Sequence, residues 1–291
     1  MIATAEDGFF APDRIAIFGV LNTTPDSFSD GGRFVCADGP VDVAGAVVVA
    51  KDLLASGADV IDIGGESTRP GSHAVAIEVE LERTLPVVEA LVAASDASTW
   101  ISIDTRKGEV ARAALAAGAR IVNDVSGLAF DPDLAGVAAE ADAWLVLGHM
   151  RGTPATMQRA PHYDDVLAEV ATELEAAIAH ARRAGVREER LVVDPGIGFG
   201  KRFEDNHALL ANVGWLRERL ALPVLVGPSR KGFLGALVGD AADARDRATH
   251  AACAIAAFAG ADGVRVHDVA GARDALAVAR TLRAARVEGL A

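Results

Sequence analysis

Residues 41–71, VDVAGAVVVAKDLLASGADVIDIGGESTRPG, contain the unit from which the fold is predicted. Residues 41–56 carry apolar side chains at helical spacing, and Gly57 follows where a helix commonly ends in a left-handed residue. The short apolar run Val60–Ile63 comes next, and a polar segment follows it as far as Gly71. A helix that ends at a glycine, then a buried strand, then a polar loop, predicts one repeat of an α/β protein.

The same unit recurs along the chain. Helical segments such as 164–184 and 247–259 separate further apolar runs, and glycines end several of these segments. Eight apolar strands alternating with eight helical segments favour an α/β fold, a single (β/α)8 TIM barrel with a parallel sheet. An open doubly wound sheet is the alternative, but no Gly-x-Gly-x-x-Gly motif follows the first run. The other predicted strands are Ile15–Leu21, Trp100–Ile103, Arg120–Val122, Trp144–Leu147, Leu191–Val193, Val224–Val226 and Gly263–Val266.

Length and composition limit the possible classes of protein. A chain of 291 residues suits one barrel, and we expect an N-terminal extension over 1–14 and the barrel domain over 15–291. The formal net charge of -13 argues against nucleic-acid and anionic-membrane binding. Cys36 and Cys253 show no metal-binding spacing, which favours a reducing cytoplasm. We expect no signal peptide and no membrane span.

Each predicted strand ends in polar residues, at the rim where barrels carry their active sites. Asp104, Asn123 and Asp194 hold such positions and together offer acceptors and an amide to the edge of a nitrogen heterocycle, a pterin or a purine. The alternative is that the two carboxylates cap the following helices or pair with basic side chains. Phe199 and Met150 would add apolar contacts to a flat ring.

Basic side chains gather at the same predicted rim, against the negative charge of the whole chain. A phosphate or pyrophosphate group would suit this cluster, with Asn22 offering an oxygen ligand to Mg²⁺. The alternative is a set of solvated surface cations. Ser229 would suit a small carboxylate, helped by nearby backbone N–H groups. The basic residues are Arg69, Arg230, Lys231, Arg265 and His267.

The segment VLNTTPDSFSDGG, residues 20–32, combines an apolar strand end with hydroxyls, an amide, carboxylates and one aromatic side chain. Its composition alone allows either an exposed turn or a mobile loop that closes over a polar ligand.

Five motifs spread over 18–269 carry a resemblance to a known family: LNTTPDSFSDGG, DIGGESTRPG, DPGIGFGK, PSRKGFLG and RVHDV. The sequence resembles the dihydropteroate synthases. The resemblance implies that 6-hydroxymethyl-7,8-dihydropterin pyrophosphate condenses with p-aminobenzoate, with Mg²⁺ assisting, to give 7,8-dihydropteroate and pyrophosphate. It also implies a dissociative substitution at the pterin methylene, with residues 20–32 acting as a lid that excludes water.

The resemblance also implies roles for individual residues. Asp104, Asn123, Asp194 and Lys231 match the pterin site of the family, and Asn22, Arg265 and His267 match its pyrophosphate and Mg²⁺ site. Of these, all except Asn123 are predicted to be catalytic, and Asn123 is predicted to bind substrate. Thr68, Arg69 and Pro70 match a second mobile loop, and Phe28, Pro70, Phe199 and Ser229 match the p-aminobenzoate pocket. Gly227 and Arg230 complete the predicted substrate-binding set.

Two positions depart from the family pattern. Gly148 stands where many members have methionine, which predicts the loss of an apolar contact to the pterin, and Pro228 removes a backbone donor beside Ser229. Two rival functions stay open, a pterin-binding methyltransferase and an inactive pterin-binding paralogue. The methyltransferase has no use for the Arg265 and His267 pair, and the intact first and second loops argue against the inactive paralogue. Family habit predicts a homodimer through the Ala-rich faces of the late helices, although the same pattern equally fits tight packing on the barrel. The alanines are Ala251, Ala252, Ala256 and Ala257.

Overall fold

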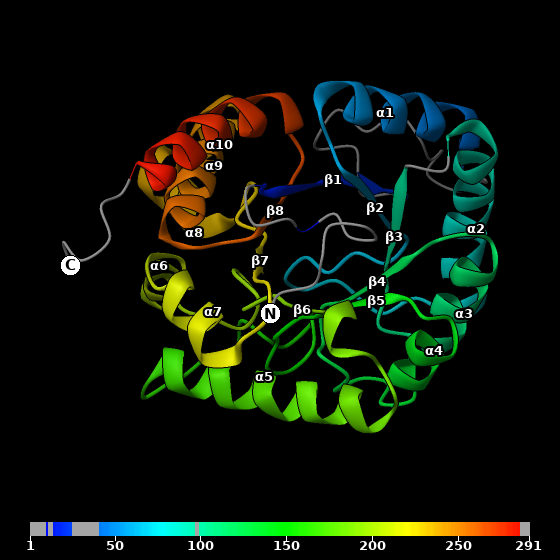
Figure 1. The fold of residues 1–291 in the computed structure, drawn as a ribbon, viewed down its shortest axis with the longest axis horizontal. Helices are drawn as coiled ribbons and strands as arrows, with labels where there is room; N and C mark the ends of the chain where they lie inside the picture. The colour runs from blue at the N-terminus through cyan, green and yellow to red at the C-terminus, as the bar shows by residue number, and fades with distance from the viewer. Residues whose placement is uncertain (1–9, 11–13, 25–40, 97–98, 286–291) are drawn as a thin grey trace.

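In the computed structural model, a ring of helices surrounds eight parallel strands (Figure 1). The structure describes residue 10 and residues 14–24, 41–96 and 99–285. All eight predicted apolar runs form strands, which confirms the (β/α)8 barrel. The strands are β1 (Ala16–Asn22), β2 (Val60–Gly64), β3 (Trp100–Asp104), β4 (Ile121–Asp124), β5 (Trp144–Leu147), β6 (Leu191–Val193), β7 (Leu225–Val226) and β8 (Gly263–Val266).

The sheet nearly closes on itself. Its strand order is β6-β5-β4-β3-β2-β1-β8-β7, so β6 and β7 are its two ends. Val193 on β6 forms a parallel bridge with Val224, and its backbone N–H donates to the Pro223 carbonyl at 3.0 Å. Because all the strand pairs are parallel, the carboxyl ends of the strands lie at one face of the molecule.

The helices alternate with the strands, but two connections hold a pair of helices rather than one. The prediction of a single helical segment was wrong between β6 and β7 and between β7 and β8. Asn212 is the C-cap residue of α6 and the N-cap residue of α7, and its side chain donates to the Ala208 carbonyl at 2.8 Å. The helices are α1 (Val43–Ser56), α2 (Ile77–Ala94), α3 (Gly108–Ala116), α4 (Leu134–Glu140), α5 (Val166–Arg183), α6 (Phe203–Ala211), α7 (Val213–Leu220), α8 (Gly232–Val238), α9 (Ala242–Ala259) and α10 (Val269–Ala284).

The barrel interior changes from apolar to polar along the strands. At the amino-terminal end, Phe10 packs against Phe18 and Trp144, with ring centroids 6.4 and 6.0 Å away, within a buried apolar cluster. Successive residues of a strand face opposite sides, so Val60 in that cluster is followed on the same side by Asp62. The apolar end stabilises the fold, and the polar end is left for the site. Among the described helices, none is long and apolar enough to cross a membrane.

Candidate active site

A cavity of about 750 Å³ opens at the carboxyl ends of the strands. Most of the residues predicted for the site line it: Asn22, Thr68, Arg69, Pro70, Asp104, Phe199, Gly227, Ser229, Arg230, Lys231, Arg265 and His267. Asn123 and Asp194 are buried. Phe28 lies outside the described residues, as does most of the predicted lid, so both remain predictions.

Strand register brings the first group of predicted residues to one level. Asn22, Gly64, Asp104 and Asn123 are partners across β1, β2, β3 and β4. A Cβ atom on Gly64 would lie 3.6 Å from Asn22 Oδ1 and 3.7 Å from Asp104 Oδ2. The glycine therefore keeps open the space between an amide oxygen and a carboxylate oxygen.

Asp62 lies in the same polar part of the barrel, and the sequence analysis did not assign it a role. It is 2% exposed, and its Oδ2 accepts from Asn123 Nδ2 at 3.2 Å and from Arg265 Nη1 at 3.4 Å. Its Oδ1 is buried and has no hydrogen-bond partner among the described residues. Buried carboxylate oxygens need donors, so this atom points to a ligand that brings an N–H group. The available signal was an acidic residue inside the apolar run of β2.

Asp104 carries unusual electrostatics. The pKa of its carboxyl is raised to about 8, chiefly by burial and also by the neighbouring Asp62, while Arg265 lowers it. The Arg265 guanidinium lies 3.6 Å from Asp104 Oδ2. Although burial disfavours the charge of Arg265, the carboxylates of Asp104 and Asp62 raise its pKa, so it stays charged. Without a ligand, Asp104 is therefore largely protonated at neutral pH.

Lys231 and Phe199 form a second wall of the cavity. The Lys231 ammonium lies 3.7 Å from the centroid of the Phe199 ring. Burial lowers the pKa of Lys231 to about 7, and Arg265 lowers it further, while Asp194 and Asp104 favour the charge. Asp194 Oδ1 accepts from the backbone N–H of Gly196 at 2.7 Å, which fixes the turn that carries Phe199.

The end of β7 presents Ser229 toward His267. Ser229 Oγ lies 2.9 Å from His267 Nδ1 and accepts from the His267 backbone N–H at 3.2 Å. Arg230 has a φ of +56° and forms two hydrogen bonds to Asp246 on α9, at 2.7 and 3.0 Å. The N–H groups that we expected to help Ser229 are used within the protein. Arg230 N–H donates to Thr249 Oγ1, and that of Lys231 donates to the Pro228 carbonyl.

The loop after β2 carries Thr68, Arg69 and Pro70, and Glu66 holds its base. Glu66 accepts from Arg106 Nε at 2.8 Å, from Lys107 Nζ at 2.8 Å and from the Val75 backbone N–H at 2.9 Å. Both ends of the loop are therefore tied to the residues that follow Asp104 on β3.

The backbone packs closely around Gly148. A Cβ atom at this position would lie 2.6 Å from Val125 Cα and 2.7 Å from the Asp124 carbonyl oxygen. In this chain the glycine allows that close backbone approach. The predicted loss of an apolar contact to the pterin stays a prediction.

Comparisons with known proteins agree with this geometry. A family model described as pterin binding enzyme matches residues 18–267. A dihydropteroate synthase of Synechocystis is 47% identical over 258 residues, which cover 88% of this chain and 86% of that relative. The chain belongs to the dihydropteroate synthase family.

Solved structures of the dihydropteroate synthase family share the fold. The Xanthomonas albilineans dihydropteroate synthase with 4-aminobenzoic acid is 46% identical, with a TM-score of 0.83 over 94% of each chain. The same enzyme in complex with 7,8-dihydropteroate is matched at 43% identity, with a TM-score of 0.80 over 94% of this chain and 95% of that one. Membership of the family therefore rests on sequence and on fold together.

Proposed function

We propose that this chain is a transferase of folate biosynthesis that condenses 6-hydroxymethyl-7,8-dihydropterin pyrophosphate with p-aminobenzoate, in the cytoplasm. The products are 7,8-dihydropteroate and pyrophosphate. The observation that carries the proposal is the set of acceptors beside Arg265, above all Asp62 Oδ1, to which no donor in the described part of the chain forms a hydrogen bond. The 4-aminobenzoic acid and 7,8-dihydropteroate complexes of the Xanthomonas relative support both substrates.

The buried polar residues suit the pterin edge. A pterin presents ring N–H and amino donors side by side, and buried carboxylates discriminate strongly in favour of such an edge. The buried Asp62 and Asp194 and the partly buried Asp104 supply the carboxylates, and the buried Asn123 amide supplies both a donor and an acceptor. Donors from the pterin would favour the ionised form of Asp104, whose pKa is raised to about 8 without them.

Arg265 and His267 suit the leaving group. In the proposed step the bond between the pterin methylene and the pyrophosphate oxygen breaks, and both electrons leave with pyrophosphate. Arg265 and His267 line the cavity, where they would stabilise that growing charge. The p-aminobenzoate nitrogen then forms a bond to the methylene carbon and loses a proton. No side-chain nucleophile takes part.

Mg²⁺ fits a site shared between Asn22 and the substrate. Among the described residues, no group of three or more His, Cys, Asp or Glu side chains could hold a metal ion alone. Mg²⁺ commonly takes one or two protein oxygens together with phosphate oxygens and water. Asn22 Oδ1 faces the space that Gly64 leaves open, so it would be the protein ligand. The bound ion would neutralise charge on the pyrophosphate.

A homodimer through α9 and α10 completes the proposal. These two helices lie side by side (Figure 1), and they expose the large apolar side chains of Ile255, Phe258, Val278 and Leu282. Ala256 and Ala257, which we had predicted for this surface, are fully buried against the barrel. The exposed larger side chains therefore support a dimer interface on these helices, whereas the two buried alanines do not.

Two substitutions test the assignment of the two halves of the cavity. We expect Asp194→Asn to weaken binding of 6-hydroxymethylpterin about 100-fold or more, because a charged acceptor is lost from a buried edge. We expect Arg265→Ala to lower kcat about 100-fold or more and to change the Kd of the same ligand less than about tenfold. Calorimetry gives the Kd and pyrophosphate release gives kcat. Unchanged affinity of Asp194→Asn for 6-hydroxymethylpterin would refute the assignment of the pterin edge. A loss of pterin affinity as large as the loss of kcat in Arg265→Ala would refute the leaving-group role.

A further inference from the structure

Lys201 is a buried cation at the wall of the cavity for which the proposed mechanism has no use. It is 2% exposed and lines the cavity. Its Nζ atom lies 2.9 Å from His149 Nδ1, 3.0 Å from the Phe199 carbonyl oxygen and 3.3 Å from the His149 carbonyl oxygen. Three acceptors match the three N–H bonds of an ammonium. They are an imidazole and two carbonyls rather than a carboxylate.

His149 connects Lys201 to a carboxylate on the outer helix α5. Its Nε2 atom lies 2.9 Å from Glu173 Oε2. Because an ionised carboxylate only accepts hydrogen bonds, Nε2 carries the hydrogen and Nδ1 is left to accept from Lys201. Burial lowers the pKa of His149 to about 4, and the charge of Lys201 lowers it further, so the ring is neutral at pH 7.

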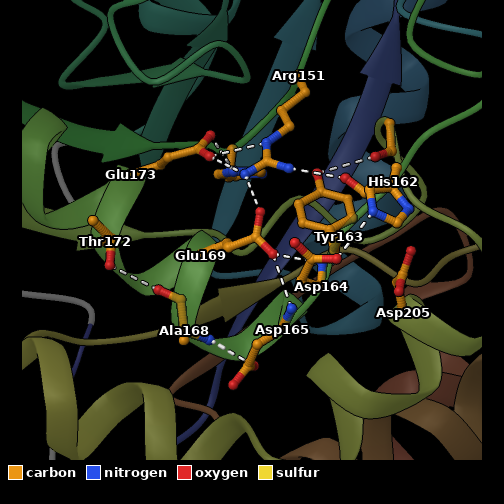
Figure 2. Close-up of polar contacts among 12 residues, drawn as sticks. Arg151, His162, Tyr163, Asp164, Asp165, Ala168, Glu169, Thr172, Glu173 and Asp205 are labelled. Carbon is orange, nitrogen blue, oxygen red and sulfur yellow. Dashed lines mark hydrogen bonds and ion pairs between the residues drawn. The ribbon is translucent and has the colours of Figure 1, made fainter.

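Glu173 is itself held in place from outside the cavity. Figure 2 shows Arg151 between Glu173 and Glu169, with the Tyr163 ring beside its guanidinium. Arg151 Nε donates to Glu173 Oε1 at 2.9 Å, and its guanidinium lies 4.1 Å from the Tyr163 ring centroid. The hydrogen bond from His149, with those from Arg151, lowers the pKa of Glu173 to about 2. Glu173 is therefore ionised throughout the neutral range.

Lys201 also contacts the turn that carries Phe199, through the Phe199 carbonyl. Asn206 Oδ1 accepts from the Gly198 backbone N–H at 2.6 Å, and Tyr163 donates to the Gly200 carbonyl at 3.0 Å. Lys201 holds the carbonyl of Phe199, which lies between these two positions. The Phe199 ring then contacts the Lys231 ammonium on the side of the cavity.

We propose that Glu173 is a positioning residue of the active site: through His149 it keeps the Lys201 ammonium on the Phe199 carbonyl, and so holds the Phe199 ring where p-aminobenzoate binds. The inference rests on the proposed function, which assigns the Phe199 wall to p-aminobenzoate. Glu173 contacts neither substrate in this account.

The charge on Lys201 depends on its surroundings near neutral pH. Burial lowers the pKa of Lys201 to about 7. Asp194 and Glu173 favour the ammonium, whereas Lys231 and Arg151 oppose it. Loss of the Glu173 charge would lower this pKa further, so the ammonium would lose its proton at a lower pH.

The kinetic test compares Glu173→Gln with Glu175→Gln. Glu175 lies on the same helix and pairs with Arg219 at 2.7 Å, outside the cavity. We expect Glu173→Gln to raise KM for p-aminobenzoate about five- to twentyfold and to leave kcat within about twofold. The Phe199 ring that contacts p-aminobenzoate would shift, but no reacting group would be lost. We also expect the alkaline limb of its pH profile to move about half a unit or more to lower pH. Glu175→Gln should match the wild type.

A second measurement needs no turnover. Only four of the 28 basic residues are lysines, namely Lys51, Lys107, Lys201 and Lys231, so isotope-labelled lysine gives a resolvable NMR titration of each ammonium. We expect Glu173→Gln to lower the Lys201 midpoint and Glu175→Gln to leave it unchanged. An unshifted Lys201 midpoint would overturn the positioning role. So would a fall in kcat as large as the rise in KM, without a change in the pH profile. If the Lys201 midpoint falls in Glu173→Gln as expected but the wild type forms no dihydropteroate, only the proposed function is refuted.

Discussion

The site gathers residues whose charges depend on one another. Arg265 Nη1 lies 3.4 Å from Asp62 Oδ2 and 3.6 Å from Asp104 Oδ2, in the polar part of the barrel interior. Burial raises the pKa of the Asp104 carboxyl, and the guanidinium only partly opposes this. The molecule therefore retains destabilising groups at this site, which is common where a ligand supplies the missing partners.

Asp104→Asn tests this balance. A carboxyl whose folded pKa is raised to about 8 destabilises the folded state progressively as pH rises from about 4 to 8, because the unfolded chain ionises first. The asparagine variant lacks that loss. Its free energy of unfolding relative to the wild type should therefore rise by about 3 to 4 kcal/mol between pH 5 and pH 8. Urea unfolding at the two pH values measures it. A difference that stays constant or falls with pH would contradict the raised pKa.

At the level of single residues, the sequence predicted what lies at strand ends. Asn22, Asp104 and Asn123 follow apolar runs directly, so parallel register alone places them together. No role was predicted for Asp62 because it lies inside a strand, where only side-chain alternation shows that it faces the barrel interior. No role was predicted for Lys201 because its proposed role depends on His149 and Glu173, which lie far from it in the sequence.

Among the secondary-structure elements, strands were predicted better than helices. A run buried on both faces is apolar throughout and leaves a clear sequence signal. The break between α6 and α7 left no such signal, because a single asparagine, Asn212, separates two segments that together read as one helical pattern. It lets α7 approach α9, where a Cβ atom on Gly214 would lie 2.4 Å from the Ala259 carbonyl oxygen. Long-range packing of this kind is not contained in local periodicity.

The start of α3 ties the second loop to the barrel through Lys107. Its ammonium contacts Glu66 at 2.8 Å and the Val75 carbonyl at 2.8 Å, and it also pairs with Glu80 on α2, which is 1% exposed. This buried group connects α2, the loop and the strand that carries Asp104. The position of Thr68, Arg69 and Pro70 therefore depends on a charge pair beneath them.

Lys107→Met should lower the free energy of unfolding by about 3 kcal/mol or more, because Glu80 would remain buried without its partner. Arg112→Met is the matched control on the same helix, where the Arg112 and Glu140 side chains are 60% and 66% exposed. We expect that control to lose less than about 1 kcal/mol. Guanidinium unfolding compares the two. Similar losses in both variants would show that Lys107 is no more important than a surface pair.

On the scale of the whole molecule, one barrel separates stability from chemistry. An apolar cluster that includes Phe10, Phe18 and Trp144 fills its amino-terminal end, and polar groups line the cavity at the other end. The chain has a formal net charge of -13, yet Arg69, Arg230, Lys231 and Arg265 all line the cavity. The clustering of these cations against the overall charge is best explained by an anionic substrate.

The measurement that tests the central claim most directly is pyrophosphate release from 6-hydroxymethyl-7,8-dihydropterin pyrophosphate in Mg²⁺, with and without p-aminobenzoate. We predict release that depends on p-aminobenzoate and yields an equal amount of 7,8-dihydropteroate, identified by mass spectrometry. Pyrophosphate release without dihydropteroate, or no release from a protein that binds the pterin, would contradict the account.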